Sequence, residues 1–145
     1  MPITIRKAEP ADFEEVFALI KEFASFIKTP EKIKTSPAQM RGDKDYFKCF
    51  IALEDRTIKG FATWFMAYYS WTAKALYLDD LYVPELYRGN GIGTLLLDKV
   101  IETAKAEKCK KVRWQVSHWN SKAIEFYKKR GAVMDDVEIN CDLMI

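Results

Sequence analysis

The sequence of 145 residues contains little cysteine and histidine. Its three cysteines, Cys49, Cys109 and Cys141, form no CxxC pair, and His118 is its single histidine. A structural zinc site needs about four ligands, usually grouped in pairs, so we expect no metal. Three unpatterned thiols are typical of small apolar core residues in a reducing compartment.

Long apolar runs and an excess of one charge are also missing. No run reaches the roughly 18 apolar residues of a membrane-spanning helix, and the start, MPITIRKAEP, lacks the apolar segment of a signal peptide. The net charge is only +2, with both signs interspersed, whereas nucleic-acid-binding proteins usually carry a basic stripe. We therefore predict a cytoplasmic protein that binds neither membrane nor nucleic acid.

The residues that are present suit one globular domain spanning 1–145. Hydrophobic residues make up 49% and charged residues 30% of the chain. The aromatic share of 14% is high, which indicates a core or a pocket built from rings.

The first third of the chain predicts a strand, a helix and a loop. ITIRKA alternates as a strand does, and the apolar residues of 10–27 recur at spacings of three and four, as on one face of a helix. Asp12 and Glu15 resemble a capping box at the start of that helix. Residues 28–45 are polar and predict a loop with one short helix.

Three runs rich in aromatic and β-branched residues predict an antiparallel meander over 46–54, 57–69 and 75–83. EDRT and SWTAK are the turns between them. A helix follows from Ile92, then a strand at 110–117.

The chain closes with two further predicted elements. The stretch NSKAIEFYKKRG predicts a short helix capped by Asn120 or Ser121, with Gly131 just past its end. A last strand is expected within 137–144.

Three of the six glycines fall within five positions, in RGNGIG at 88–93. A strand, a glycine-rich turn and a helix form an anion site, because the helix start exposes unpaired N–H groups and glycine lets a ligand approach the backbone. Arg88 is suited to adding a charge-assisted bond to a phosphate. The alternative is a glycine-rich turn that binds nothing.

The spacing discriminates between phosphate-binding motifs. The Rossmann pattern fails because Leu96 stands where its third glycine belongs, and the P-loop pattern fails because Thr94 follows Gly93 without a lysine. The pattern [QR]-x-x-G-x-[GA] does fit residues 88–93. It resembles the pyrophosphate loop of the acetyl-coenzyme A-dependent N-acetyltransferases of the GNAT superfamily, and WNSKAIEFYKKRGA resembles that family's second signature.

Within the superfamily, GFATWF, WTAKALYLDDLYV, YRGNGIG and EFYKKRGA resemble the spermidine/spermine (diamine) N-acetyltransferases and their thialysine-acetylating relatives. The resemblance covers almost the whole chain. It implies an α/β (α+β) GNAT fold with a mixed, mostly antiparallel sheet. The sheet would splay between its fourth and fifth strands, 75–83 and 111–117, where the coenzyme enters. It also implies a homodimer.

The resemblance assigns the coenzyme contacts to three stretches. Leu81, Tyr82 and Val83 would face the pantetheine arm. The diphosphate would lie on the loop formed by Arg88, Gly89, Asn90, Gly91, Ile92, Gly93 and Thr94. Asn120, Lys122, Ala123 and Tyr127 would line the other side.

The resemblance also implies the catalytic roles. Tyr127 would be the general acid, since a phenol with a pKa near 10 stays protonated at neutral pH. Asp79 would be the general base through water, with Asp80 helping to hold the amine. In a regular strand adjacent side chains point to opposite faces, so both reach one cleft only if a bulge re-aims one of them. The alternatives are a packed aromatic at 127 and a solvent-facing acidic pair.

The acceptor half departs from the polyamine enzymes. Trp71 and Gln115 match acceptor-side positions, but Phe26 and Ile27 stand where those enzymes have a tyrosine and a glutamate. We therefore predict an acyltransferase that acetylates a small primary amine, such as a diamine, polyamine or lysine- or thialysine-like molecule. A non-catalytic acyl-CoA-binding module and an enzyme acting on a protein lysine or N-terminus are the alternatives.

Overall fold

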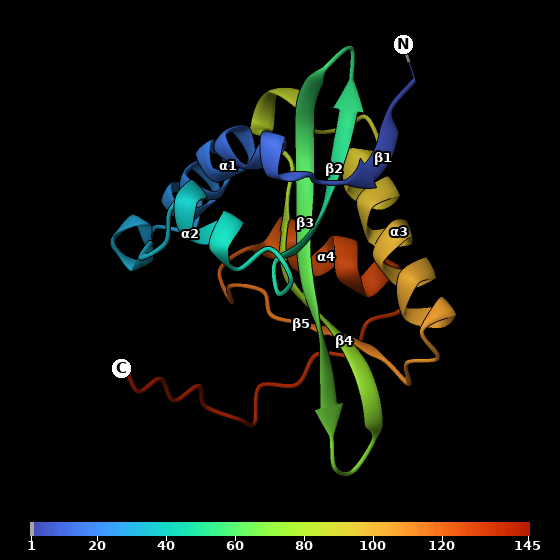
Figure 1. The fold of residues 1–145 in the computed structure, drawn as a ribbon. Coiled ribbons are helices and arrows are strands. Elements are labelled where there is room, and N and C mark those ends of the chain that lie inside the picture. The colour runs from blue at the N-terminus through green and yellow to red at the C-terminus, as the bar shows by residue number, and fades with distance from the viewer. Residues whose placement is uncertain (1) are drawn as a thin grey trace. The chain divides into compact units, whose positions relative to one another are not determined.

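The computed structural model describes residues 2–145 and divides into two compact units, one ending at Gln115 and the other spanning Val116–Ile145. Figure 1 traces the elements of each unit along the chain. The sheet, the glycine loop and the Asp79–Asp80 pair all belong to the first unit.

The first unit is built on a five-stranded sheet in the order β1-β2-β3-β4-β5. The first four strands pair antiparallel, which confirms the predicted meander, and β5 runs parallel to β4. The fold is thus α+β with a mixed, mostly antiparallel sheet, as predicted. The strands are β1 Thr4–Lys7, β2 Lys48–Glu54, β3 Thr57–Tyr69, β4 Ala73–Tyr82 and β5 Val112–Trp114.

Helices flank the sheet of this unit, with α1 and α2 on one side and α3 on the other (Figure 1). Alternation along β2 explains this arrangement, because neighbouring side chains of a strand face opposite ways. Ile51 packs in the core cluster with Phe13 and Val16 of α1, whereas Phe50 faces Lys99 of α3. The helices of the first unit are η1 Pro10–Asp12, α1 Phe13–Phe26, η2 Pro30–Lys32, α2 Pro37–Gly42, η3 Glu85–Tyr87 and α3 Ile92–Ala106.

The turn between β2 and β3 is the one that EDRT predicts. Asp55 and Arg56 form its two central positions, and both have positive φ, 50° and 68°. Two such residues match the right-handed twist of the strands they join. The local sequence therefore fixes this hairpin.

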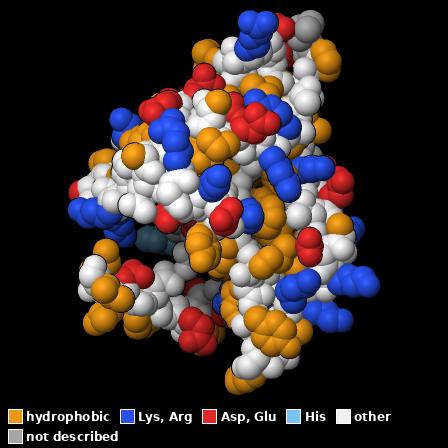
Figure 2. Space-filling model, viewed as in Figure 1, with side chains coloured by type: hydrophobic (Ala, Val, Ile, Leu, Met, Phe, Trp, Pro, Cys, Tyr) orange, Lys and Arg blue, Asp and Glu red, His pale blue; other side chains and the backbone are white. Residues whose placement is uncertain are grey.

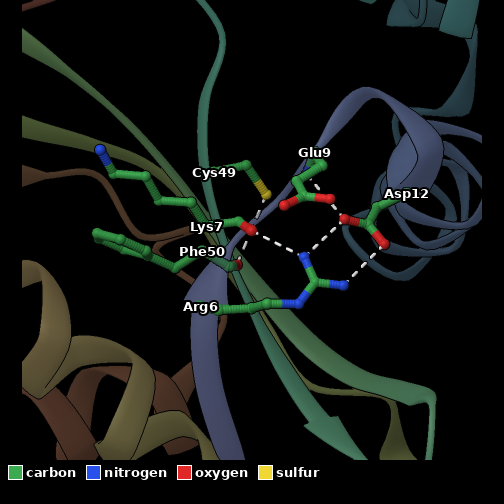
Figure 3. Close-up of polar contacts among 6 residues, drawn as sticks. All are labelled: Arg6, Lys7, Glu9, Asp12, Cys49 and Phe50. Atoms are coloured by element: carbon green, nitrogen blue, oxygen red, sulfur yellow. Dashed lines mark hydrogen bonds and ion pairs between the residues drawn. The ribbon is translucent and has the colours of Figure 1, made fainter.

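The predicted capping box of Asp12 and Glu15 at the start of α1 is wrong. Asp12 makes no capping bond to the helix; it accepts a hydrogen bond of 2.7 Å from the amide of Glu9 and pairs with the Arg6 guanidinium at 2.8 and 3.1 Å (Figure 3). The short helix η1 before α1 brings Asp12 back toward β1. The pairing with Arg6 keeps the pKa of Asp12 below its ordinary value.

The second unit contains α4, Ser121–Lys129. Of the two predicted caps the structure uses Asn120, whose side chain accepts a hydrogen bond of 3.3 Å from the amide of Ala123. Gly131, just past the helix end, has a φ of 90° as expected of a helix-terminating glycine.

The strand predicted within 137–144 is absent, since residues 132–145 carry no regular secondary structure. Val137, Ile139 and Leu143 do alternate with polar residues, but they are 78%, 87% and 87% exposed. Alternation alone does not make a strand, because the backbone must also find a partner to pair with. The fifth strand is likewise shorter than the predicted 110–117.

The surface agrees with the small net charge. Figure 2 shows Lys and Arg side chains interspersed with Asp and Glu over the face in view. Within residues 2–145, no helix combines the length and the apolar character that crossing a membrane would require.

Candidate active site

The glycine loop leads directly into α3. Gly91 occupies the N-cap position with a φ of 77°, and Gly89 has a φ of 85°. No side chain of the described residues caps this helix start. A Cβ atom added to Gly89 or Gly91 would meet no atom within 4 Å. The space beside Gly89 and Gly91 is thus open where the chain enters α3, and a helix start with room beside it fits a bound anion such as a diphosphate.

The sheet opens beside this loop. β5 pairs with β4 over only three residues, Leu76–Leu78, whereas β4 continues to Tyr82. Among the described residues, Asp79–Tyr82 therefore have no partner on the β5 side. Leu81 and Tyr82 lie in this open stretch and Val83 follows it, so their backbone groups border the gap between the two strands.

A β-bulge interrupts the pairing of β3 with β4 at the acidic pair. Thr63 pairs with Asp80 and Trp64 pairs with Leu78, which leaves Asp79 as the extra residue. A bulge re-aims side chains that would otherwise alternate. As a result, Asp79 and Asp80 line the same pocket.

That pocket has a volume of about 310 Å³ and lies wholly within the first unit. Three of its lining residues are acidic and one is a lysine, so the balance of formal charge is negative. Its walls are largely aromatic and aliphatic. The lining residues are Ile20, Thr35, Met40, Asp43, Tyr46, Phe47, Lys48, Thr63, Trp64, Phe65, Asp79 and Asp80.

Comparison with known proteins identifies the family. The model of the acetyltransferase (GNAT) family matches residues 13–132, most of the chain. The chain belongs to this family. It is therefore an N-acetyltransferase, and the family uses acetyl-CoA as co-substrate.

Two curated relatives of this chain are named as acetyltransferases of amines. The acetyltransferase is 34% identical over 140 residues to "Thialysine N-epsilon-acetyltransferase" of Mus musculus, covering 88% of this chain and 82% of the relative. It is 35% identical to "Spermidine/spermine N(1)-acetyltransferase-like protein 1" of Homo sapiens, covering 89% of this chain but only 20% of that longer protein.

Solved structures share its fold at lower identity. An aminoglycoside acetyltransferase from an uncultured soil metagenomic sample superposes with a TM-score of 0.81 at 18% identity, covering 98% of this chain and 97% of the other. An integron cassette protein of V. cholerae gives a TM-score of 0.78 at 21% identity, with coverage of 99% and 93%. These two likenesses establish the fold alone.

Asp79 and Asp80, two of the three carboxyl groups that line the acetyltransferase's pocket, differ in their surroundings. Burial raises the pKa of Asp80 to about 6, the nearby charge of Asp79 adds to this, and a hydrogen bond of 2.7 Å from the Thr63 hydroxyl opposes it. Asp79 is more exposed to water, yet surrounding protein displaces part of its hydration and raises its pKa too. Both groups are thus stronger bases than a free carboxylate.

Asp43 and Tyr46 were not identified as site residues from the sequence. Both lie just past α2 and both line the pocket. Asp43 falls in the predicted loop 28–45, whereas the sequence predicts Tyr46 as the first residue of the strand 46–54, which begins only at Lys48. Asp43 accepts a hydrogen bond of 2.9 Å from the Gln39 side chain, one turn earlier. Tertiary packing brings them to the same pocket as the acidic pair, because α2 packs against α1 and its Met40 joins the core cluster. No local sequence pattern predicts that packing.

Four predicted acceptor residues do not line this pocket. Trp71 is 97% exposed at the tip of the β3–β4 hairpin, whereas Asp79 lies about 20 Å along the extended strand from its start at Ala73. Phe26 and Ile27 end α1, and Phe26 lies against Arg88 instead. Gln115 follows β5 and is exposed. Their predicted contacts with the acceptor stay predictions.

The remaining predicted residues lie in the second unit. Tyr127 is 8% exposed, and burial raises its pKa to about 12. Its phenol therefore stays protonated at neutral pH. Asn120 caps α4, and Lys122 and Ala123 form its first turn. Across residues 2–145, no three His, Cys, Asp or Glu side chains are grouped so that they could hold a metal.

Proposed function

We propose that this acetyltransferase moves the acetyl group of acetyl-CoA directly to a primary amine of a small molecule. The acceptor class is a diamine, a polyamine or a lysine- or thialysine-like molecule. The observation that carries the proposal is the β4 bulge, which turns Asp79 and Asp80 into one pocket with Asp43. Such a pocket attracts an ammonium group. The names of the curated relatives point to the same class of acceptor.

The chain's own groups would position the coenzyme, which supplies the acetyl group as a thioester when bound. The first-turn amides of α3 would hold the diphosphate, and the unpaired β4 backbone at Leu81 to Val83 would hold the pantetheine arm. Asn120, Lys122 and Ala123 are assigned to the coenzyme by the family resemblance. Positioning of this kind is worth several orders of magnitude in rate.

Proton transfers would fall to Asp79 and Tyr127. An amine attacks only after losing a proton, and Asp79 would take that proton through water; its raised pKa suits a base. The amine nitrogen then bonds to the acetyl carbon as the carbon–sulfur bond breaks, and it releases its second proton to solvent to become the amide nitrogen. Tyr127 would give its phenolic proton to the departing sulfur and recover one from solvent.

Asp43 bears on the choice of acceptor. The sequence suggested that the acceptor side had lost anionic groups at Phe26 and Ile27. The pocket contains a third carboxylate from a different element, which restores negative charge. We therefore keep acceptors with a second cationic group in the proposed class.

The decisive test measures consumption of acetyl-CoA with putrescine, spermidine, spermine, lysine, thialysine and amino sugars, and with lysine-containing peptides as a parallel arm. We expect turnover with at least one small primary amine. Turnover confined to peptides would favour a protein acceptor. Coenzyme binding without turnover on any amine would favour a binding module.

Asp79→Asn tests the assigned base. The wild-type rate should fall as the pH drops through the pKa of the acidic pair, because the protonated carboxyl cannot accept the amine's proton. The amide variant should lose this limb and most of its activity, whereas Asp98→Asn, on α3 and outside the pocket lining, should behave as wild type. An unchanged pH profile would remove Asp79 from this role.

A further inference from the structure

Arg88 is the first residue of the glycine loop, and its side chain packs against other parts of the first unit. Its Nε donates a hydrogen bond of 2.7 Å to the carbonyl of Val83, across the connection between β4 and the loop. Its guanidinium lies 4.6 Å from the ring centre of Phe26 and 5.6 Å from that of Tyr82. One side chain thus contacts the end of β4, the last residue of α1 and its own connecting segment.

One of the two rings that receive Arg88, that of Tyr82, is itself held in place. Tyr82 stacks on Phe23 of α1 with ring centres 5.0 Å apart, and its hydroxyl donates a hydrogen bond of 2.6 Å to Glu22. Tyr82 is almost fully buried. Arg88 therefore rests against a fixed surface formed by α1 and β4.

We propose that Arg88 is a positioning residue, which fixes the entry to the coenzyme loop by clamping it to the end of α1 through Phe26 and to Val83. The inference rests on the proposed function, in which the loop from Gly89 to Thr94 holds the coenzyme. It gives Phe26 a role as well: its ring is the platform for the guanidinium. The contact of Arg88 with coenzyme would then be indirect.

A direct bond from Arg88 to a phosphate predicts different behaviour. In that case positive charge at position 88 matters and the ring at position 26 does not. For a clamp, the planar guanidinium and the ring matter together, because lysine keeps the charge but loses the Nε donor and the flat stacking face. The two roles are separable by mutating both partners.

The experiment compares the wild type with Arg88→Lys, Phe26→Leu and the double variant, with Phe26→Tyr as the matched control that keeps a ring. Coenzyme A binding is measured by calorimetric titration, and KM for acetyl-CoA and kcat are measured with the best acceptor. Thermal unfolding of each variant checks that it folds.

Each single variant should weaken coenzyme A binding by about 3- to 10-fold, raise KM to match and leave kcat within about 2-fold. The double variant should bind no more weakly than Arg88→Lys alone, since one contact is lost in each case. Phe26→Tyr should bind as the wild type does.

Two results would overturn the inference: wild-type affinity in Phe26→Leu, or losses that multiply in the double variant. Failure of the wild type itself to bind coenzyme A would instead contradict the proposed function.

Discussion

At the scale of single residues, the acetyltransferase places ionisable groups where surrounding protein displaces part or most of their hydration. Asp79, Asp80 and Tyr127 all have raised pKa values because of burial. A raised pKa makes a carboxylate a better base and keeps a phenol protonated. Such perturbed groups are typical of functional sites, and they are costly for folding.

Tyr127→Phe should lower kcat by about 10- to 1000-fold, the range for one proton-transfer group, while coenzyme affinity stays near the wild-type value. The ring remains, so the packing of α4 is preserved. Steady-state kinetics and a coenzyme A titration check this. Tyr68→Phe, at a position 77% exposed on β3, is the matched control and should retain activity. Normal turnover by the Tyr127 variant would exclude it as the acid.

Asp80→Asn should stabilise the protein at neutral pH. The folded-state pKa of Asp80, about 6, lies above its ordinary value of 3.8, so the folded protein holds this proton more tightly. The cost of ionising it is absent at low pH, grows between the two values and is complete above the higher one. The amide can still accept the hydrogen bond from Thr63.

We expect the free energy of unfolding of Asp80→Asn to exceed that of the wild type by about 1 kcal/mol at pH 8, which raises Tm by a few degrees. The gain is small because the Asp80 carboxyl keeps partial contact with water. The gain should vanish at pH 4, and activity should fall. Thermal unfolding at both pH values provides the measurement. An equal shift at pH 4 and pH 8 would contradict the assigned cause.

At the scale of secondary-structure elements, α3 lies unusually close to the sheet. A Cβ atom at Gly60 on β3 would come within 3.1 Å of both Leu96 Cδ1 and the Tyr82 carbonyl oxygen, and within 3.2 Å of Ile92 Cγ2. A carbonyl of the sheet cannot move cheaply. Gly60 therefore sets the distance between β3 and the first turn of α3, where the glycine loop ends.

Gly60→Ala should destabilise the protein by about 1–3 kcal/mol, as overpacking does, and weaken coenzyme A binding because the first turn of α3 is displaced. Gly42→Ala is the control, since a Cβ atom there meets nothing within 4 Å and the residue belongs to α2. Chemical denaturation and calorimetric titration measure both effects. Equal stability of the two variants would mean that α3 adjusts freely.

At the scale of the whole molecule, the chain divides by its internal contacts at Gln115, whereas the sequence predicts one domain over 1–145. The family match extends from residue 13 to 132, across that boundary. The single domain, the homodimer and the cytoplasmic location stay predictions.

We expect one cooperative thermal transition, with calorimetric and van't Hoff enthalpies in agreement, as a single folding domain gives. Differential scanning calorimetry of the full chain measures the number of transitions. It is repeated at a low and a high protein concentration, and sedimentation shows at each concentration whether the predicted dimer is present. A second transition, lost when residues after 115 are removed, would show that the last thirty residues fold as a separate unit.

Local sequence determined the elements and the glycine loop. The apolar spacing of α1 and α3, the positive-φ turn at Asp55 and Arg56, the cap at Asn120 and the glycines of the loop depend on neighbours within a few residues. Such short-range preferences survive in almost any tertiary context, so the order of elements was predictable. The terminal strand failed and the fifth strand is shorter than predicted, because a strand also needs a distant partner.

Tertiary structure alone decided how the pocket is formed and what Arg88 contacts. The bulge that aims Asp79 depends on the register of β3, Asp43 reaches the acidic pair through the docking of α2, and the platform for Arg88 comes from α1, some sixty residues away. These arrangements depend on contacts between segments far apart in the chain. A periodicity or a motif describes residues that are close in sequence, so it does not specify contacts between distant segments.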